Sequence, residues 1–152
     1  MEARMTHPVF LVPAAMKALQ AYSSAADGLG VPEVTRELVN LRASQINGCS
    51  VCVELHGTAL KKAGESDERL FAVAAWRDAP YFTDAERAAL ELAEAVTRVA
   101  DRGDPVSDEV WADVARHYDE QQISALLIAI TGVNVWNRLN AATHQVSGAW
   151  TP

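Results

Sequence analysis

The sequence contains little cysteine. Its 152 residues include only two Cys, too few for the disulfide frameworks that stabilise small secreted domains. A chain of this length buries roughly 70% of its unfolded surface in a single core, so its stability requires neither disulfides nor a structural metal. We therefore expect one globular domain over residues 1–152, and the two cysteines call for a different role.

Positive charge is also scarce, because 13 Lys and Arg stand against 20 Asp and Glu, a formal net charge of −7. Phosphate binding needs a basic surface and the counterion release that it provides. This balance therefore argues against a nucleic-acid partner and against an anionic membrane. The excess of negative charge is local, since residues 84–120 carry eleven acids and four arginines. The rest of the chain has a net charge of zero. Such a segment predicts a solvated face of surface helices.

Long apolar runs are absent as well. The longest strongly apolar stretch runs from Ala125 to Ile130 and continues weakly to Trp136, well short of the ~20 residues that span a bilayer. The first residues lack the basic-then-apolar pattern and the small-residue cleavage site of a signal peptide. We expect the reducing cytoplasm, where a cysteine pair is more often catalytic, redox-sensing or metal-binding than structural.

Strand-like alternation is missing too, whereas helical periodicity with start and stop signals recurs along the chain. The pattern predicts an all-α domain of about seven helices. Thr83 and Glu86 have the spacing of a capping box. The last helix is apolar almost all round between Ile123 and Trp136, which predicts a central helix of the domain or of a subunit interface. The expected helices cover residues 13–26, 32–47, 49–63, 66–76, 83–100, 107–118 and 119–142.

The two cysteines form a Cys-X-X-Cys motif, Cys49 to Cys52, directly after the helix-stop dipeptide Asn47-Gly48. Free backbone N–H groups and the positive dipole end at a helix start favour thiolate over thiol, which makes such a pair nucleophilic near neutral pH. His56 follows four residues after Cys52. The three side chains fall within an arc of about 60° on one helix face, so the imidazole can reach the Cys52 sulfur and exchange a proton with it.

The cysteine pair also permits a zinc site, a coincidental pairing or a structural disulfide. A zinc site would have at most three ligands, Cys49, Cys52 and His56, because the chain has no other Cys and no second ligand pair at finger-like spacing. A coincidental pair of buried cysteines is disfavoured by the helix break and the in-phase His. A structural disulfide would close too small a loop to add much stability. We expect neither a metal nor a cofactor.

The segment around the motif resembles a known family. Residues 37–56, ELVNLRASQINGCSVCVELH, resemble the signature of the AhpD-like alkylhydroperoxidases, within the carboxymuconolactone decarboxylase superfamily. The resemblance continues through residues 63–65, Trp76, residues 81–90 and residues 134–138, and so covers roughly Val34 to Arg138. It implies an all-helical bundle that assembles as a homo-oligomer, a trimer or hexamer, with the cysteine pair in a pocket near a subunit interface.

The resemblance also implies a role for each site residue. Cys52 would attack the O–O bond of a small hydroperoxide and become a sulfenic acid, and Cys49 would then condense with it to a disulfide. A thiol or dithiol reductant would restore the pair. His56 and Glu37 match the family's proton relay, although Glu37 by itself is an ordinary helix carboxylate. Some members carry a His immediately before the second cysteine, where this chain has Val51, and this removes one proton carrier.

The remaining polar and aromatic residues are expected to be structural. Arg42 pairs with an acid or anchors an interface, and Ser44 and Asn47 cap the end of their helix rather than contact the sulfurs. Polar groups on the otherwise apolar last helix need buried partners, which predicts structural hydrogen bonds for Asn134, Asn137 and Arg138. Core or interface positions are expected for Trp76, Trp111 and Trp136. No neighbours that would create a ligand site accompany His7, His117 and His144.

These observations predict a thiol-dependent alkyl hydroperoxide reductase, with two alternatives. A lyase of the carboxymuconolactone decarboxylase type would use His56 and Glu37 as acid and base on the same fold, although such members generally lack the redox cysteine pair. A non-enzymatic redox-responsive or metal-binding assembly would use the pair without turnover. The fold is predicted better than the reaction, because one scaffold hosts several chemistries.

Overall fold

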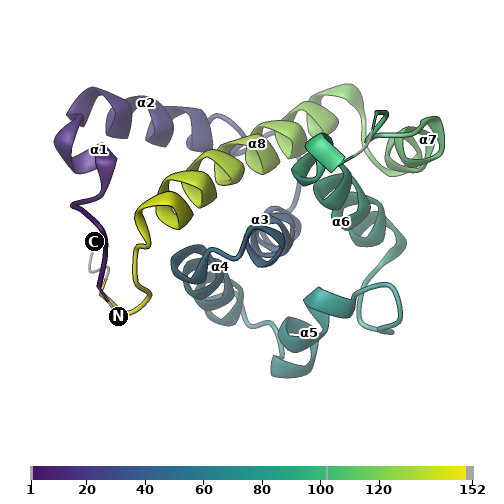
Figure 1. Ribbon diagram of the computed structural model, residues 1–152. Coiled ribbons are helices and arrows are strands. Elements are labelled where there is room, and N and C mark those ends of the chain that lie inside the picture. The colour runs from purple at the N-terminus through teal and green to yellow at the C-terminus, as the bar shows by residue number, and fades with distance from the viewer. Residues whose placement is uncertain (1, 102, 150–152) are drawn as a thin grey trace.

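The structure is a computed structural model that describes residues 2–101 and 103–149 (Figure 1). The described residues form helices and no strand, which confirms the all-α prediction. Within residues 2–101 and 103–149 there are eight α-helices, where about seven were expected. Residues 1, 102 and 150–152 of the expected domain lie outside the described part. The helices are α1 (Pro8–Leu11), α2 (Pro13–Ser24), α3 (Glu33–Asn47), α4 (Ser50–Lys62), α5 (Asp67–Ala72), α6 (Asp84–Thr97), α7 (Asp108–His117) and α8 (Glu120–Thr143), with the 3-10 turns η1 (Val73–Ala75) and η2 (Val99–Asp101).

Local capping explains most of the helix boundaries. The Thr83 hydroxyl accepts the N–H of Glu86, whose carboxylate accepts the N–H of Thr83, and this is the expected capping box at the start of α6. α3 ends at Gly48, which has a left-handed φ of 66° that only glycine adopts without cost. The helix expected over residues 66–76 divides into α5 and η1, and the helix expected to about residue 100 ends at Thr97.

α1 is the helix that the sequence pattern did not predict. The ring Nδ1 of His7 accepts the N–H of Val9 at 3.2 Å, and Pro8 occupies the first helical position. A helix of one turn shows no hydrophobic periodicity, so only this cap distinguishes it in the sequence. His7 is buried, although the sequence offered it no evident neighbours.

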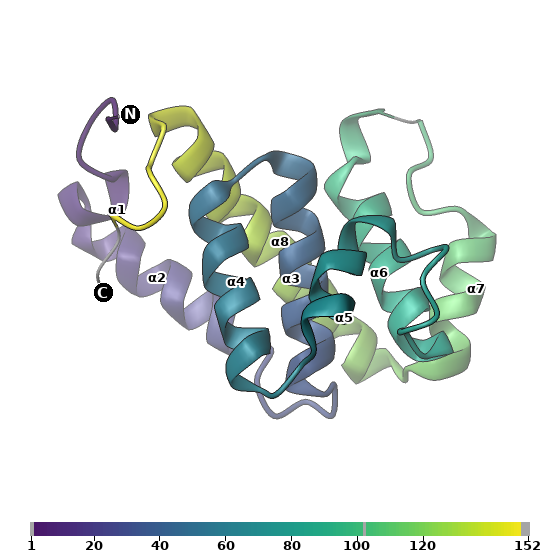
Figure 2. The same ribbon diagram turned by 90° about the horizontal axis from the view of Figure 1, so that it is seen from below.

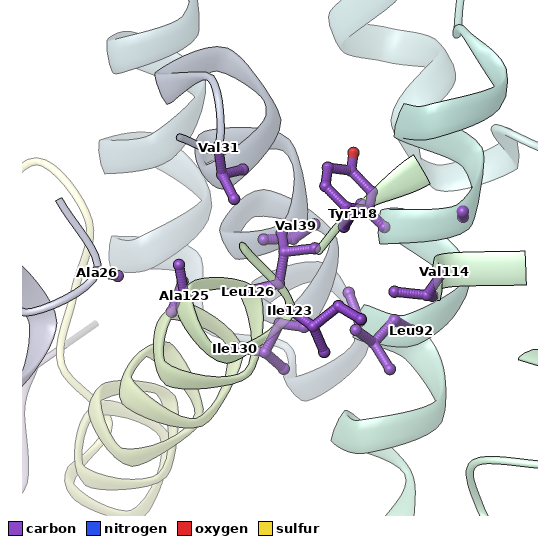
Figure 3. Close-up of a cluster of buried hydrophobic side chains, with 14 residues drawn as sticks. Ala26, Val31, Val39, Leu92, Val114, Tyr118, Ile123, Ala125, Leu126 and Ile130 are labelled. Carbon is purple, nitrogen blue, oxygen red and sulfur yellow. The ribbon is translucent and has the colours of Figure 1, made fainter. Parts of the chain in front are cut away.

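The main hydrophobic core lies between α3, α6, α7 and α8 (Figure 3). Val39 of α3, Leu92 of α6, Val114 of α7 and Leu126 of α8 are fully buried, and each contributes about 2 kcal/mol relative to an exposed side chain. α8 also contacts α2, which confirms that it is a central helix of the domain. Among the described residues, no helix is long and apolar enough to cross a membrane.

A second cluster of buried side chains joins α3, α4, η1 and α6 through Leu38, Leu60, Val73 and Leu90. Trp76 belongs to this cluster, as expected of a core aromatic residue. Trp111 of α7, in contrast, is 46% exposed. α3 contributes to both clusters and packs against α4, α6 and α8 (Figure 2), and the cysteine motif begins directly after its C-terminal end.

α1 and α2 form an arm at one edge of the molecule (Figure 2), which we call the N-terminal arm (residues 8–24). α2 buries none of its residues. Phe10, Leu11 and Val12, at the junction of the two helices, are all more than half exposed. The arm is joined to α8 by a hydrogen bond of 2.8 Å between the hydroxyls of Tyr22 and Thr131. The arm therefore leans on α8 and leaves apolar side chains uncovered.

The acidic residues of segment 84–120 are exposed or half-buried, as predicted, with one exception. Glu94 of α6 is 7% exposed, and its carboxylate accepts hydrogen bonds from Arg42 at 2.7 Å and from the Trp76 indole at 2.9 Å. This confirms that Arg42 pairs with an acid. Buried carboxylates require such partners, because an unpaired charge is costly away from water.

Candidate functional site

The cysteine motif lies where α3 ends and α4 begins. Cys49 is the N-cap of α4, and its sulfur accepts the backbone N–H of Cys52 at 3.3 Å. The two Cα atoms are 5.4 Å apart and the sulfurs are disulfide-bonded. Both cysteines are almost fully buried. The expected helix start is thus confirmed, and one free amide of that start is directed at the Cys49 sulfur.

His56 and Glu37 are brought together by the packing of α4 on α3. The His56 Nδ1 lies 2.7 Å from the Glu37 Oε2, and both side chains are mostly buried. A carboxylate at Nδ1 holds the N–H on that nitrogen and leaves Nε2 free to accept or return a proton. Among the described residues, no hydrogen bond links His56 to either sulfur. The pairing with Glu37 is a contact that the sequence could not predict from helix phase.

A cavity of about 680 Å³ opens between α2, α3, α4 and α8 and contains most of the candidate residues. Cys52, His56 and Glu37 line it, whereas Cys49 does not. A small molecule in this cavity therefore meets one sulfur of the pair and not the other. Most of the exposed wall surface is apolar, with contributions from Phe10, Met16, Val51, Leu55, Ala129, Val133 and Trp136. Polar side chains complete the wall, namely Gln20, Ser23, Ser24, Asp27, Arg36, Asn40 and Asn140.

Trp136 of α8 covers the cysteine pair. It packs against the buried cluster of Cys49, Val51 and Cys52, and its indole N–H donates to the Ser23 hydroxyl at 3.3 Å. The ring of His7 stacks on Trp136 with 6.0 Å between centroids. Burial lowers the pKa of His7, so His7 stays neutral at physiological pH. Its uncharged ring packs on the ring of Trp136.

No group of three or more His, Cys, Asp and Glu side chains in the described part of the chain is arranged to hold a metal ion. The largest set of possible metal ligands in the sequence is the trio Cys49, Cys52 and His56. His117 lies in the last turn of α7, and His144 ends α8 in a left-handed conformation.

Buried amides connect the end of α3 to α8. The Asn47 amide donates to the side-chain oxygens of Asn134 and Asn137, at 2.9 Å each. Asn137 donates in turn to the Ser44 hydroxyl at 3.1 Å. The structural role expected for Asn134 and Asn137 is confirmed. The capping role expected for Ser44 and Asn47 is wrong, because the backbone N–H groups of residues 48 and 49 satisfy the last carbonyls of α3 while these side chains bond elsewhere.

Asn140 of α8 contacts the Cys52 sulfur. The sequence pattern did not identify it as a site residue. Its side-chain Nδ2 donates to that sulfur at 3.3 Å, and the residue is 4% exposed. Asn134, Asn137 and Asn140 are spaced three residues apart on an otherwise apolar helix, so they share one face. This spacing is the signal that could have identified Asn140, although nothing local indicated which of the three meets a sulfur.

Proteins of related sequence and structure are known. The chain is 34% identical to the uncharacterized protein YdfG of Bacillus subtilis (strain 168) over 132 residues, which cover 87% of this chain and 88% of YdfG. It is 36% identical to the uncharacterized protein YnjA of Escherichia coli (strain K12) over 109 residues, which cover 72% of this chain and 58% of YnjA. The crystal structure of ATU0492 from Agrobacterium tumefaciens, a protein of unknown function, matches with a TM-score of 0.89 at 29% identity over 96% of this chain and 98% of that one.

More distant structures share the fold. The debrominase Bmp8 matches with a TM-score of 0.78 at 21% identity, over 90% of this chain and 73% of its own. The family model of the carboxymuconolactone decarboxylase family matches residues 13–95, which is more than half of the sequence and includes the cysteine motif, His56 and Glu37. The expected resemblance is therefore confirmed, and the chain belongs to the carboxymuconolactone decarboxylase family, with the AhpD-like fold.

Proposed function

We propose that this protein is a thiol-dependent peroxidase that reduces organic hydroperoxides through a dithiol–disulfide cycle. The observation that carries the proposal is the shared cavity, in which Cys52 lies at disulfide distance from Cys49 and beside the His56–Glu37 pair. ATU0492, which has been provisionally named as an antioxidant defence protein, AhpD, supports the same class of activity.

The proposed reaction starts at Cys52, because its sulfur is the one that lines the cavity. The Cys52 thiolate attacks the terminal, hydrogen-bearing oxygen of the hydroperoxide, an S–O bond forms, and the O–O bond breaks with its electron pair on the leaving alkoxide. His56, oriented by Glu37, gives the alkoxide a proton. The product at Cys52 is a sulfenic acid.

Cys49 resolves the sulfenic acid. Its thiolate is stabilised at the N-cap of α4 by the N–H of Cys52. It attacks the sulfenic sulfur, hydroxide leaves and takes up a proton as water, and the disulfide forms. An external thiol or dithiol then reduces the disulfide and returns both cysteines to the starting state.

The cavity wall supports an organic substrate. Its lining is mainly apolar, so an alkyl or aryl group gains burial that hydrogen peroxide does not. Val51, which replaces the inter-cysteine His of some related sequences, contributes to this wall. The proton relay of this protein then consists of His56 and Glu37 without a second imidazole.

The proposal is tested by thiol titration. Reduced protein should contain two reactive thiols per chain, and one equivalent of cumene hydroperoxide should remove both. Cys52→Ser should abolish peroxide consumption, whereas Cys49→Ser should stop at a sulfenic acid that dimedone traps at Cys52. Thiol counts that peroxide leaves unchanged would contradict the mechanism.

The same variants separate the alternative chemistries of this fold. A lyase that uses the His56–Glu37 pair as acid and base keeps its turnover in Cys52→Ser. A metal-binding assembly contains one zinc per chain and shows unreactive thiols until a chelator removes the metal. Either result would replace the peroxidase proposal.

We also propose that the chain assembles as a homo-oligomer, a trimer or hexamer. The N-terminal arm supports this proposal, because α2 buries no residue within the chain and Phe10, Leu11 and Val12 are exposed. Contiguous exposed apolar side chains are typical of a protein–protein contact. Phe10 and Met16 belong both to the arm and to the cavity wall, so an assembled arm would also enclose the site.

A further inference from the structure

The two ends of the Asn140 amide have unequal partners. Nδ2 donates to the Cys52 sulfur at 3.3 Å. Oδ1 is buried and has no hydrogen-bond partner among the described residues. Asn140 lines the cavity that also contains His56 and Glu37. One residue of the cavity wall thus combines a donor at the Cys52 sulfur with an acceptor that no described group uses.

An unsatisfied buried acceptor lowers stability, so its presence requires a physical reason. The two neighbouring amides of the same helix face are fully paired. Asn134 donates to Thr97 and accepts from Asn47, and Asn137 donates to Ser44 and accepts from Asn47. Asn140, the amide that contacts the Cys52 sulfur, differs from both because its oxygen has no partner among the described residues. A ligand that carries an O–H group would satisfy its oxygen.

We propose that Asn140 is a further catalytic residue that acts on both reactants of the peroxide step. Its Nδ2 stabilises the thiolate of Cys52, and its Oδ1 accepts the O–H hydrogen bond of the bound hydroperoxide. The second half of this proposal rests on the proposed peroxidase function. The first half concerns the reduced protein alone.

The chemistry of the step is consistent with a single amide in both roles. The thiolate attacks the oxygen that carries the hydrogen, and that O–H bond is retained in the sulfenic acid that forms. Asn140 can therefore hold the same O–H group before and after the transfer, while the O–O bond breaks and the alkoxide receives its proton from His56. The amide itself neither gains nor loses a proton, so its action is positioning and electrostatic stabilisation.

The thiolate contact is tested by the pKa of Cys52, measured in a Cys49→Ser background from the pH dependence of iodoacetamide alkylation. Asn140→Leu keeps the size but removes the donor, and it should raise the pKa of Cys52 by about one unit, since a hydrogen bond to a charged group is worth that much. Asn140→Asp places a carboxylate at the sulfur and should raise the pKa of Cys52 further. An unchanged pKa in both variants would overturn this half.

Asn40 provides a matched control for the pKa measurement. It lines the same cavity, its Oδ1 is also buried without a partner in the described chain, and none of its hydrogen bonds reaches either sulfur. Asn40→Leu should therefore leave the pKa of Cys52 unchanged. A rise equal to that of Asn140→Leu would show that cavity polarity, and not the Asn140 contact, sets the pKa, and would overturn the assignment.

The substrate contact is tested at a pH above both thiol pKa values, where the thiolate is fully formed in every variant. There, Asn140→Leu should still reduce the second-order rate with cumene hydroperoxide by about tenfold, the effect of one lost hydrogen bond. A wild-type rate would overturn the substrate half. Failure of wild-type protein to react would overturn both that half and the proposed function, while the pKa result still decides the thiolate half.

The folding of the variants is itself informative. Because Asn140→Leu removes an unsatisfied acceptor, its melting temperature should be no lower than that of the wild type. Asn140→Asp, which has nearly the same shape as Asn140, supplies the pKa test if the Leu variant does not fold. If Asn140 were merely structural, its replacement would lower the melting temperature and leave the pKa of Cys52 unchanged.

Discussion

At the scale of single residues, the site combines information of two kinds. Cys52 and His56 lie on α4 and Cys49 is its N-cap, so the closeness of the three in the chain followed from local spacing. Glu37 and Asn140 come from separate helices, and their side chains reach His56 and the Cys52 sulfur only in the packed chain. The first three were identifiable as a chemical group from local spacing. Glu37 was identified by resemblance, and Asn140 was not identified.

Replacement of Glu37 tests the relay. Glu37→Gln keeps a hydrogen-bond acceptor for the His56 Nδ1 but removes the negative charge beside the imidazole. The second-order rate with cumene hydroperoxide should fall by about 10²-fold, the usual contribution of an acid–base group, while the melting temperature stays near that of the wild type. Stopped-flow peroxide reduction measures the rate.

Glu33 is the control for that substitution. It lies in the first turn of the same helix, α3, and is exposed, so Glu33→Gln changes the net charge equally and should leave the rate unchanged. A wild-type rate in Glu37→Gln would remove Glu37 from the relay. A tenfold or greater loss in Glu33→Gln would instead indicate a long-range charge effect.

At the scale of helices, Glu94 joins three parts of the chain. Its carboxylate accepts from Arg42 of α3 at 2.7 Å, from Arg98 of its own helix at 2.8 Å, and from Trp76 and Arg77 after η1 at 2.9 Å each. Burial acts to raise the pKa of Glu94, but the hydrogen bonds from Trp76, Arg77 and Arg42 outweigh it and lower the pKa to about 2. The ionised carboxylate is therefore part of the packing of α6 on α3.

This pKa predicts the acid sensitivity of the fold. Since the pKa of Glu94 is lower in the folded than in the unfolded chain, its contribution is present above pH 4.5 and is lost as the pH falls toward 2. The contribution is about 3 kcal/mol to the free energy of unfolding. In urea unfolding between pH 6 and pH 2.5, Glu94→Gln should be less stable at pH 6, and the difference should shrink across this window.

Glu91 is the control for the acid-unfolding experiment. It lies on α6 close to Glu94, and its ion pair with Arg77, at 3.3 Å, is largely exposed. Such a pair contributes little, so Glu91→Gln should unfold like the wild type at every pH. Parallel pH curves for Glu94→Gln and the wild type would contradict the role assigned to Glu94.

At the scale of the whole molecule, the N-terminal arm is the part least explained by a single chain. It leaves Phe10, Leu11 and Val12 exposed and is joined to α8 by hydrogen bonds of Tyr22 and Ser23. Because the arm also lines the cavity, assembly and substrate access are linked in the proposed oligomer. The single-domain organisation over residues 1–152 stays a prediction.

Substitution in the arm tests the assembly. Leu11, 60% exposed in the chain, should lie in an apolar contact between subunits. Leu11→Glu would place a charge there and should shift the protein from trimer or hexamer to a smaller species in light scattering coupled to gel filtration. Leu11→Met, which preserves the apolar surface, should retain the wild-type mass. An unchanged mass in Leu11→Glu would exclude the arm from the interface.

The sequence by itself determined the helical class, most helix boundaries and the position of the cysteine pair at a helix start. Each of these depends on groups at most a few residues apart, such as the capping box at Thr83 and Glu86 or the left-handed stop at Gly48. Such signals lie within short stretches of sequence, because helical hydrogen bonds and side-chain neighbours recur within one or two turns. One boundary signal, the His7 cap of α1, was too short to be recognised.

Only the tertiary structure decided which distant residues meet the motif. Asn140 lies 88 residues after Cys52 in the sequence, and Glu37 and His56 lie on different helices. The cavity is bounded by α2, α3, α4 and α8, so its shape depends on how the packing of the two cores orients those helices. Local spacing placed two sulfurs and an imidazole near the start of α4, and the packed helices supplied the carboxylate, the amide and the apolar space for a substrate.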